Sequence, residues 1–185
     1  DTSWGIANAS SPIFVAKDSL NNLQPITAPI TVAMNTVAGD THFGKRYVFF
    51  GTGSYFRTSD PADTSVQTWY GLIDEGTTIS GRASLKQRTI VPVGPTTRKF
   101  STPVAGDMVS KQGWYIDFTS IAGERMITKS LYANLIKPAL ISSSIIPDVS
   151  DRCVAGGRGF VNAMDPFSGG AVTSGLFDVN GNGNF

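Results

Sequence analysis

Short apolar stretches separated by turn-forming residues run through this chain, and the clearest of them lie between residues 45 and 74. Residues 46–50, Arg-Tyr-Val-Phe-Phe, are too few for a helix and end at Gly51-Thr52-Gly53, so they predict a buried strand closed by a tight turn. Residues 67–74 predict a second strand that pairs with the first. The polar residues 54–65 between them contain Pro61, and we expect an excursion at one end of the sheet.

Other segments before residue 114 are also typical of short strands. Residues 24–35 alternate apolar residues with smaller or polar ones, and Pro25 and Pro29 restrict this segment to strand starts or a sheet edge. Residues 83–93 predict another short strand, with no helix signal. The polar residues 94–112 are either an insertion or a pair of weak strands.

The last third of the chain contains one ambiguous segment. Residues 114–118 predict a strand, followed by a turn at Gly123. Within residues 125–146 the spacing of Leu131 and Leu135 is compatible with a short helix. Pro138 and the β-branched run behind it favour two strands instead.

A faint repeat connects three of the predicted strands. Residues 69–74, 114–117 and 160–165 each begin with an aromatic residue, end in Asp and precede a Gly-containing turn, and they recur about 45 residues apart. This spacing is near the blade period of β-propellers, which close with roughly four to eight blades. The period predicts about three to four blades in residues 1–185, as part of one domain that begins and ends inside the fold.

Composition narrows the classes of function. The chain has 185 residues, 41% of them hydrophobic, which suits a globular domain. A net charge of +1 and scattered Lys and Arg give no basic patch for nucleic acid. No apolar run reaches the roughly 18 to 20 residues of a membrane span, so none is predicted.

Low charge and abundant Ser, Thr, Asn and Gly favour an exported protein. The chain starts at Asp1 without an apolar leader, so we expect any signal peptide to lie elsewhere or to have been removed. Cys153 is the only cysteine, and it is either buried or bonded to a cysteine outside this sequence.

Several short motifs carry a resemblance to a known family. They begin with Phe-Gly-Thr-Gly-Ser-Tyr-Phe at residues 50–56, followed by Ser59-Asp60, Asp63 and the strand at 67–74. Further motifs follow in the same order: residues 82–85, 113–117, 123–125, 151–153 with Gly156-Gly157, and 165–170. In order and spacing the chain resembles the C-terminal β-propeller of the PilY/PilC family of type IV pilus biogenesis factors and tip adhesins.

The resemblance implies an all-β fold: a partial, quinoprotein-like β-propeller of four-stranded antiparallel blades, with residues 11–18 as the outer strand of one blade. It implies a non-enzymatic module at the pilus tip, cell surface or outer membrane, acting in pilus assembly, adhesion and twitching motility. The partners it implies are minor pilins, the remainder of the propeller, and host or surface receptors. The adhesive Arg-Gly-Asp tripeptide of some members is absent.

The C-terminal residues fit the first half of a calcium loop. Asp178, Asn180 and Asn182 supply side-chain oxygens at positions 1, 3 and 5, and Asn184 follows a glycine with its carbonyl at position 7. The acidic residue of position 12 is absent, so an isolated site should be weak. Family members bind calcium through a related loop, which favours calcium as the cofactor; a plain Asn-Gly turn is the alternative.

Catalytic interpretations have simpler alternatives. His42, the only histidine, lies near Asp40 and could act as a base, but an exposed loop histidine is favoured because no nucleophile motif is present. Paired carboxylates could hydrolyse glycosides, although their positions at strand ends favour turn capping. These carboxylates are Asp74, Glu75, Asp117, Glu124 and Asp165. Glu124 and Arg125 predict an internal salt bridge, and no catalytic residue is assigned.

Two other functions stay open at this point. A quinoprotein-like dehydrogenase fragment would commonly need a vicinal cysteine pair, which this chain lacks. A carbohydrate-binding propeller would stack sugars on exposed aromatic residues such as Trp69 or Trp114. Because Trp69, Tyr70, Trp114 and Tyr115 belong to recurring strands, packing between blades is favoured for them. The glycines at 156–159 follow no strand-to-helix pattern and do not predict a phosphate site.

Overall fold

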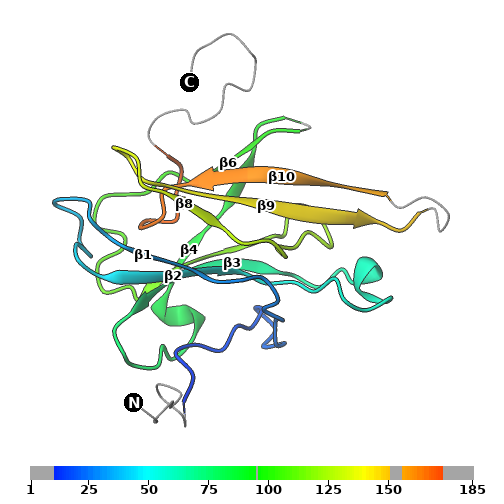
Figure 1. The fold of residues 1–185 in the computed structure, drawn as a ribbon, viewed down its shortest axis with the longest axis horizontal. Helices are drawn as coiled ribbons and strands as arrows, with labels where there is room; N and C mark the ends of the chain where they lie inside the picture. Colours follow the sequence, from blue (N-terminus) through cyan, green and yellow to red (C-terminus); the bar gives the residue numbers. More distant parts are fainter. Residues whose placement is uncertain (1–10, 95, 151–155, 173–185) are drawn as a thin grey trace, which may run out of the picture.

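The fold of this chain is all-β, as predicted (Figure 1). A computed structural model describes residues 11–94, 96–150 and 156–172. Two short 3-10 helices, η1 (Asp60–Ala62) and η2 (Arg82–Ser84), interrupt the strands. The strands are β1 (Thr31–Met34), β2 (Arg46–Gly51), β3 (Thr68–Asp74), β4 (Lys86–Arg88), β5 (Ile90–Pro92), β6 (Arg98–Phe100), β7 (Gly113–Asp117), β8 (Leu131–Ala133), β9 (Ala139–Asp148) and β10 (Gly156–Met164).

The larger sheet has the order β1-β2-β3-β7-β4. Its first four strands are antiparallel neighbours, and β4 pairs in parallel with β7 at the far edge. The predicted strands at 46–50, 67–74 and 114–118 are therefore confirmed, including the pairing of the first two. The excursion predicted at 54–65 contains η1 and extends beyond one end of this sheet (Figure 1).

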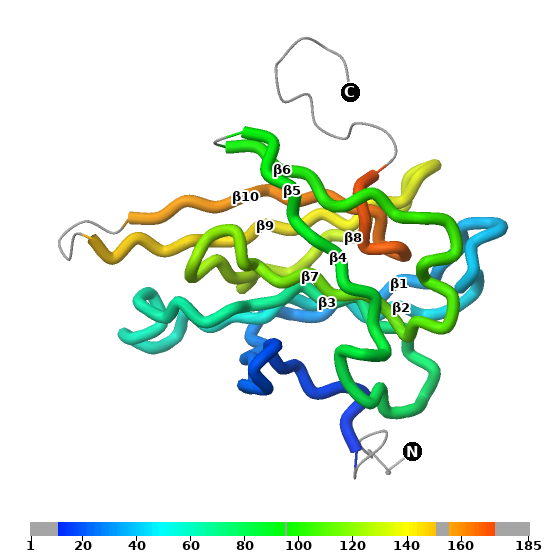
Figure 2. The backbone as a smooth tube through the Cα atoms, turned by 180° about the vertical axis from the view of Figure 1, so that it is seen from behind, coloured from blue at the N-terminus to red at the C-terminus, as the bar shows by residue number. Residues whose placement is uncertain are grey.

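A second layer lies over the first one. It consists of the antiparallel sheet β10-β9-β8, and the β5–β6 hairpin lies near β10 (Figure 2). The β9–β10 ladder is long, running from Gly156 opposite Asp148 to Met164 opposite Leu140. Two strands in residues 125–146 were the favoured prediction, and they are observed.

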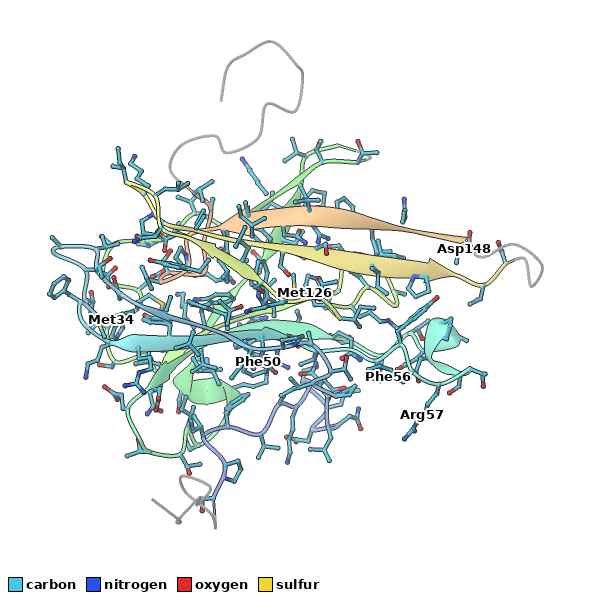
Figure 3. The ribbon with its side chains drawn as sticks, in the orientation of Figure 1. Met34, Phe50, Phe56, Arg57, Met126 and Asp148 are labelled. Atoms are coloured by element: carbon cyan, nitrogen blue, oxygen red, sulfur yellow. The ribbon has the colours of Figure 1, made fainter. Side chains whose placement is uncertain are left out.

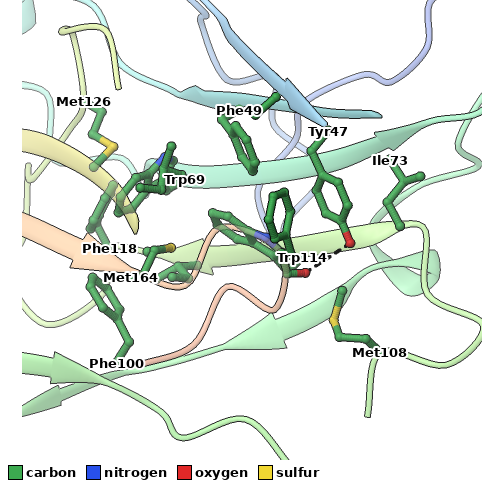
Figure 4. Packing of buried hydrophobic residues seen from close by; sticks show 14 residues of the cluster. Tyr47, Phe49, Trp69, Ile73, Phe100, Met108, Trp114, Phe118, Met126 and Met164 are labelled. Carbon is green, nitrogen blue, oxygen red and sulfur yellow. Dashed lines mark hydrogen bonds between the residues drawn. The ribbon is translucent and has the colours of Figure 1, made fainter. Parts of the chain in front are cut away.

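Aromatic side chains fill the space between the two layers (Figure 4). The rings of Trp69 and Trp114 meet edge-on at 6.0 Å, and both residues are fully buried. Trp114 Nε1 donates to the Pro166 carbonyl at 2.7 Å. The Tyr47 hydroxyl donates to the Phe167 carbonyl at 3.1 Å, and burial raises the pKa of this phenol well above its ordinary value. These bonds attach the segment after β10 to the larger sheet.

The opposite face of the larger sheet is also apolar. Phe50, Tyr70 and Leu72 lie there under the N-terminal segment that contains Ala16. β3 is consequently buried on both faces, which is typical of a central strand. The N-terminal segment does not cover β1, where Val32 and Met34 are 51% and 54% exposed.

Three expectations are wrong, and a fourth is confirmed in part. Residues 11–18 form no strand and contribute only an isolated bridge between Lys17 and Leu23. The strand expected in residues 24–35 is confirmed only over Thr31–Met34, after both prolines, and it lies at the predicted sheet edge. Residues 82–84 form η2, although no helix was expected. The described part of residues 94–112 contributes one strand, β6, which pairs with β5, and not the pair of weak strands that was one alternative.

The aromatic-led repeat does not mark successive propeller blades, although its spacing of about 45 residues predicts that. Residues 69–74 and 114–117 are neighbours in a single sheet, with Tyr70 opposite Tyr115. They are therefore not equivalent strands of successive blades. Their similar sequences reflect similar surroundings, because each strand buries a Trp on the face between the layers and carries a Tyr on the other.

Candidate interaction surfaces

The excursion between β2 and β3, residues 54–65, is held in shape by its own side chains, and we call it the aromatic loop. Asp60 Oδ2 accepts hydrogen bonds from Ser54 Oγ at 2.6 Å, from the Phe56 amide at 2.8 Å and from the Arg57 amide at 3.0 Å. The Ser54 hydrogen bond is the main reason that the pKa of Asp60 lies below its ordinary value. The loop is thus ordered around one carboxylate.

Arg125 holds the same loop from beneath. Its side chain is 1% exposed and its guanidinium donates to the carbonyls of Ser54 at 3.1 Å, Asp60 at 2.6 Å and Asp63. Its Nε donates to the Gly123 carbonyl. The internal salt bridge predicted between Glu124 and Arg125 is therefore wrong, because Arg125 bonds to backbone oxygens.

The aromatic loop presents two large apolar side chains to solvent. Phe56 is 81% exposed and Tyr55 46%. Tyr55 also lines a groove of about 350 Å³, together with apolar residues of β9 such as Ile145 and the glycine-rich start of β10. Figure 3 shows Phe56 at the same end of the molecule as Asp148. Aromatic residues on a pre-ordered loop beside an apolar groove are typical of a protein contact surface.

A second feature, the polar cleft, has a volume of about 710 Å³. Its walls come from the turn after Lys17, from residues 78–83, from β4 and from β7. Arg82 donates to Asp117 and lies 4.0 Å above the Tyr115 ring. Burial alone would lower the pKa of Arg82, but the hydrogen bond and charge of Asp117 outweigh it and the pKa is raised. The guanidinium is therefore fixed in its charged form.

Buried side chains behind the polar cleft hold two of its lining residues, Asp117 and Lys17, through hydrogen bonds. The Thr68 hydroxyl donates to Asp117 at 2.7 Å and accepts from the Gln24 side chain at 2.7 Å. The Tyr70 hydroxyl approaches Gln24 Oε1 at 2.8 Å and the Lys17 carbonyl at 3.0 Å. Burial raises the pKa of Tyr70 to about 12, so it stays a neutral donor.

Two buried ion pairs fasten the segment between β4 and β7. Arg98 on β6 binds Glu124 and donates to Asn162 on β10. Arg88 on β4 makes two hydrogen bonds to Asp107, at 2.5 and 2.9 Å. Sequence reasoning missed both pairs, since neither partner lies near the other in the chain.

The carboxylates singled out in the sequence have two kinds of role. Turn capping is confirmed for Asp74, which accepts from the Gly76 amide, and for Asp165, which accepts from the amides of Phe167 and Ser168. It is wrong for Asp117 and Glu124, which pair with arginines, and Glu75 pairs with Lys45 at the surface. Each carboxylate thus has a bonding partner of its own, and Asp74 and Asp117 lie at opposite ends of the paired strands β3 and β7.

His42 differs from the exposed loop histidine that was expected. It is half-buried, with Nδ1 3.4 Å from the Tyr47 hydroxyl, while its backbone amide donates to Asp40. Within the described residues no group of three or more His, Cys, Asp or Glu side chains could hold a metal ion. The calcium-loop residues Asp178, Asn180, Asn182 and Asn184, and also Cys153, lie outside the described residues.

Trp69 and Trp114 are packed between the two layers and do not reach the surface, so neither stacks on a ligand. Tyr115 is half-buried at the polar cleft. No helix among the described residues is long and apolar enough to cross a membrane.

Comparisons with known proteins place this chain beside pilus proteins, although no protein-family model matches it. A type IV pilus biogenesis factor PilY1 homologue of Xylella fastidiosa is 37% identical over 189 residues, covering 99% of this chain and 14% of the relative. The type IV pilus biogenesis factor PilY1 of Pseudomonas aeruginosa (strain PAK) is 31% identical over 204 residues, covering 96% of the chain and 17% of the relative. The chain thus spans less than one fifth of the length of these relatives.

The fold is similar to that of a solved protein as well. The crystal structure of the Pseudomonas aeruginosa PilY1 C-terminal domain matches with a TM-score of 0.62 and 26% sequence identity. The match covers 86% of this chain and 35% of the solved chain.

Proposed function

Because this chain is a homologue of one segment of the PilY1 type IV pilus biogenesis factors, we propose that it is a non-enzymatic, pilus-associated module acting in pilus assembly, surface adhesion and twitching motility. The observation that carries this proposal is the 37% identity over 99% of the chain. It also supports export of the protein to the pilus tip, the cell surface or the outer membrane.

The finer fold belongs to the proposal too. We propose that residues 1–185 are part of one β-propeller domain; the count of about three to four blades came from the spacing of about 45 residues, which the pairing of β3 with β7 does not support. The four-stranded antiparallel arrangement β1-β2-β3-β7 and its face-to-face packing on β8–β10 support blade-like sheets. The remainder of the propeller would then be an intramolecular partner, through the apolar face that Val32 and Met34 leave exposed.

The aromatic loop is the surface that we assign to a pilus partner, with minor pilins first and host or surface receptors second. Phe56 exposes most of its ring on a loop that Asp60 and Arg125 already hold in place. Little ordering entropy is therefore lost when a partner binds, which favours a contact there.

Replacement of Phe56 tests this assignment in the bacterium that carries the gene. Phe56→Ala should reduce sheared surface pili and the twitching zone at least about threefold, because truncation of a central aromatic contact costs about 1 to 2 kcal/mol. Lys99→Ala, at an exposed position of β6, is the matched control and should leave both unchanged. Normal piliation and twitching after deletion of all 185 residues would refute the pilus role itself.

Calcium binding by Asp178, Asn180, Asn182 and Asn184 stays a proposal, supported by their spacing in the sequence. In this proposal calcium fixes a loop and does no chemistry. Calorimetric titration of the full chain with calcium should give a saturable isotherm that Asp178→Ala abolishes. A flat isotherm for the unaltered chain would leave a plain turn as the correct interpretation.

A further inference from the structure

We propose that the polar cleft binds a neutral carbohydrate through hydrogen bonds. Its volume of about 710 Å³ suits a ligand of one or a few sugar rings, since ligand pockets commonly measure about 300 to 1,000 Å³. This inference does not depend on the pilus role, because it concerns the chemistry of the cleft walls alone.

The charges of the cleft are balanced. The charged residues that line it are Lys17, Asp18, Arg82 and Asp117, two of each sign. Arg82 is neutralised by Asp117, and the Asp18 carboxylate accepts three hydrogen bonds from Leu20 and Asn22 in its own turn. An anionic or cationic ligand would find no excess of opposite charge here, so a neutral ligand is favoured.

The remaining polar lining is suited to hydroxyl groups. Neutral polar residues also line the cleft, and they include Gln87, Asn21 and Tyr115. Sugar hydroxyls both donate and accept, so they can use amide and hydroxyl partners of either kind. Arg82 Nε is buried and has no acceptor within the described residues, which leaves one donor of the cleft wall unsatisfied.

The aromatic residues define how a sugar would lie. Trp69 and Trp114 are fully buried, so stacking on them is excluded. Arg82 lies over the Tyr115 ring, so Tyr115 offers its hydroxyl and not an open face. Val15 and Ile79 supply the apolar contacts that the C–H groups of a sugar ring require. The cleft therefore selects the ligand by hydrogen bonding more than by stacking.

The test is titration of the full chain, labelled with ¹⁵N, with glucose, galactose, mannose and N-acetylglucosamine, followed by amide NMR shifts. We expect saturable shifts with at least one of these sugars. Gln87→Ala and Tyr115→Phe should each weaken binding about three- to tenfold, because each removes a single hydrogen bond. Gln87 is exposed, and Tyr115→Phe keeps the ring, so both variants should fold. Lys99→Ala, outside the cleft, should bind as the unaltered chain does.

Three outcomes would overturn the proposal. The first is the absence of saturable binding with all four sugars. The second is binding that both cleft variants retain unchanged, which would put the sugar elsewhere. The third is tighter binding of sialic acid, titrated in the same way, than of any of the four neutral sugars, which would show that the charge argument is wrong. Each of these outcomes is independent of the piliation assay.

Discussion

Four arginines determine much of the tertiary structure at the scale of single residues. Arg82, Arg88, Arg98 and Arg125 each bind a group that lies 19 or more residues away, and the largest separation is the 80 residues between Arg88 and the Ser168 carbonyl. Three of them pair with carboxylates, whereas Arg125 is surrounded by carbonyl oxygens. A guanidinium has five donors in a fixed plane, so it can join several distant segments at once.

The sequence identified some of these residues but not their partners. Glu124 was singled out and was expected to pair with its neighbour Arg125, yet its partner is Arg98. Partner choice among charged residues depends on which strands meet, and that is decided by the apolar residues. The predictions for Asp74 and Asp165 succeeded because turn capping needs only residues two or three positions away.

The Arg88–Asp107 pair predicts a pH dependence of stability. Hydrogen bonds from Arg88 lower the pKa of Asp107 below its ordinary value of 3.8. A carboxylate with a lowered pKa in the folded state stabilises it above the unfolded pKa, and this contribution is lost as the pH falls through the folded pKa. Asp107→Asn should therefore cost about 2 kcal/mol at pH 7 and flatten the loss of stability below about pH 4.

Urea unfolding of both proteins between pH 2.5 and 7 measures this effect. Asp18 and Asp60 also have lowered pKa values, so the variant should keep part of the acid sensitivity. Lys99→Ala should follow the unaltered chain at every pH. Parallel curves for Asp107→Asn and the unaltered chain would show that the Arg88 pair has no part in acid unfolding.

At the scale of elements, the predictable strands are those densest in aromatic and β-branched residues. The predicted bounds of β2, β3 and β7 nearly match the observed ones, because runs rich in aromatic and β-branched residues favour the extended conformation. The order β3-β7-β4 was not predictable, because β7 enters between strands that precede it in the chain. The strand prediction for residues 11–18 failed for a related reason. This segment contains apolar residues because it covers Phe50 and Tyr70, and a segment can cover them without forming a strand.

The β3–β7 pair contains a close contact that predicts a severe substitution. A Cβ placed on Gly71 would lie 2.3 Å from Trp114 Cε2, and Trp114 is fixed by its bond to the Pro166 carbonyl. Gly71→Ala should therefore destabilise the fold by about 2 to 3 kcal/mol through overpacking. Thermal unfolding followed by Trp fluorescence gives the measurement.

Gly156→Ala is the matched control. It places the same methyl group at the exposed start of β10, where the nearest atom is Asp148 Cβ at 3.2 Å. We expect a change of less than about 1 kcal/mol there. Equal effects of the two substitutions would mean that loss of glycine flexibility, and not the Trp114 contact, controls the stability of β3.

At the scale of the whole molecule, the larger sheet is the structural centre. One face packs on β8–β10 through Trp69 and Trp114, and the other face is apolar but only partly covered. A sheet that is apolar on both faces is stable when layers lie on both sides of it. The family resemblance identified the all-β class and the pilus relatives, whereas the spacing of the aromatic motifs did not reveal which strands are neighbours.

The uncovered part of that face leads to a prediction about the propeller. Val32 and Met34 lie on the edge strand β1, and each is about half exposed in the chain described here. In the proposed propeller a further sheet would cover them. Val32→Lys with Met34→Lys should then change the unfolding free energy of the 185-residue chain by less than about 0.5 kcal/mol. In the longer protein that the propeller proposal requires, the same pair of substitutions should cost at least about 2 kcal/mol of unfolding free energy, because two ammonium groups would be buried between sheets.

Val104→Lys, in an exposed loop, is the control and should be neutral in both proteins. A double variant that is neutral in both proteins would mean that no sheet packs over β1.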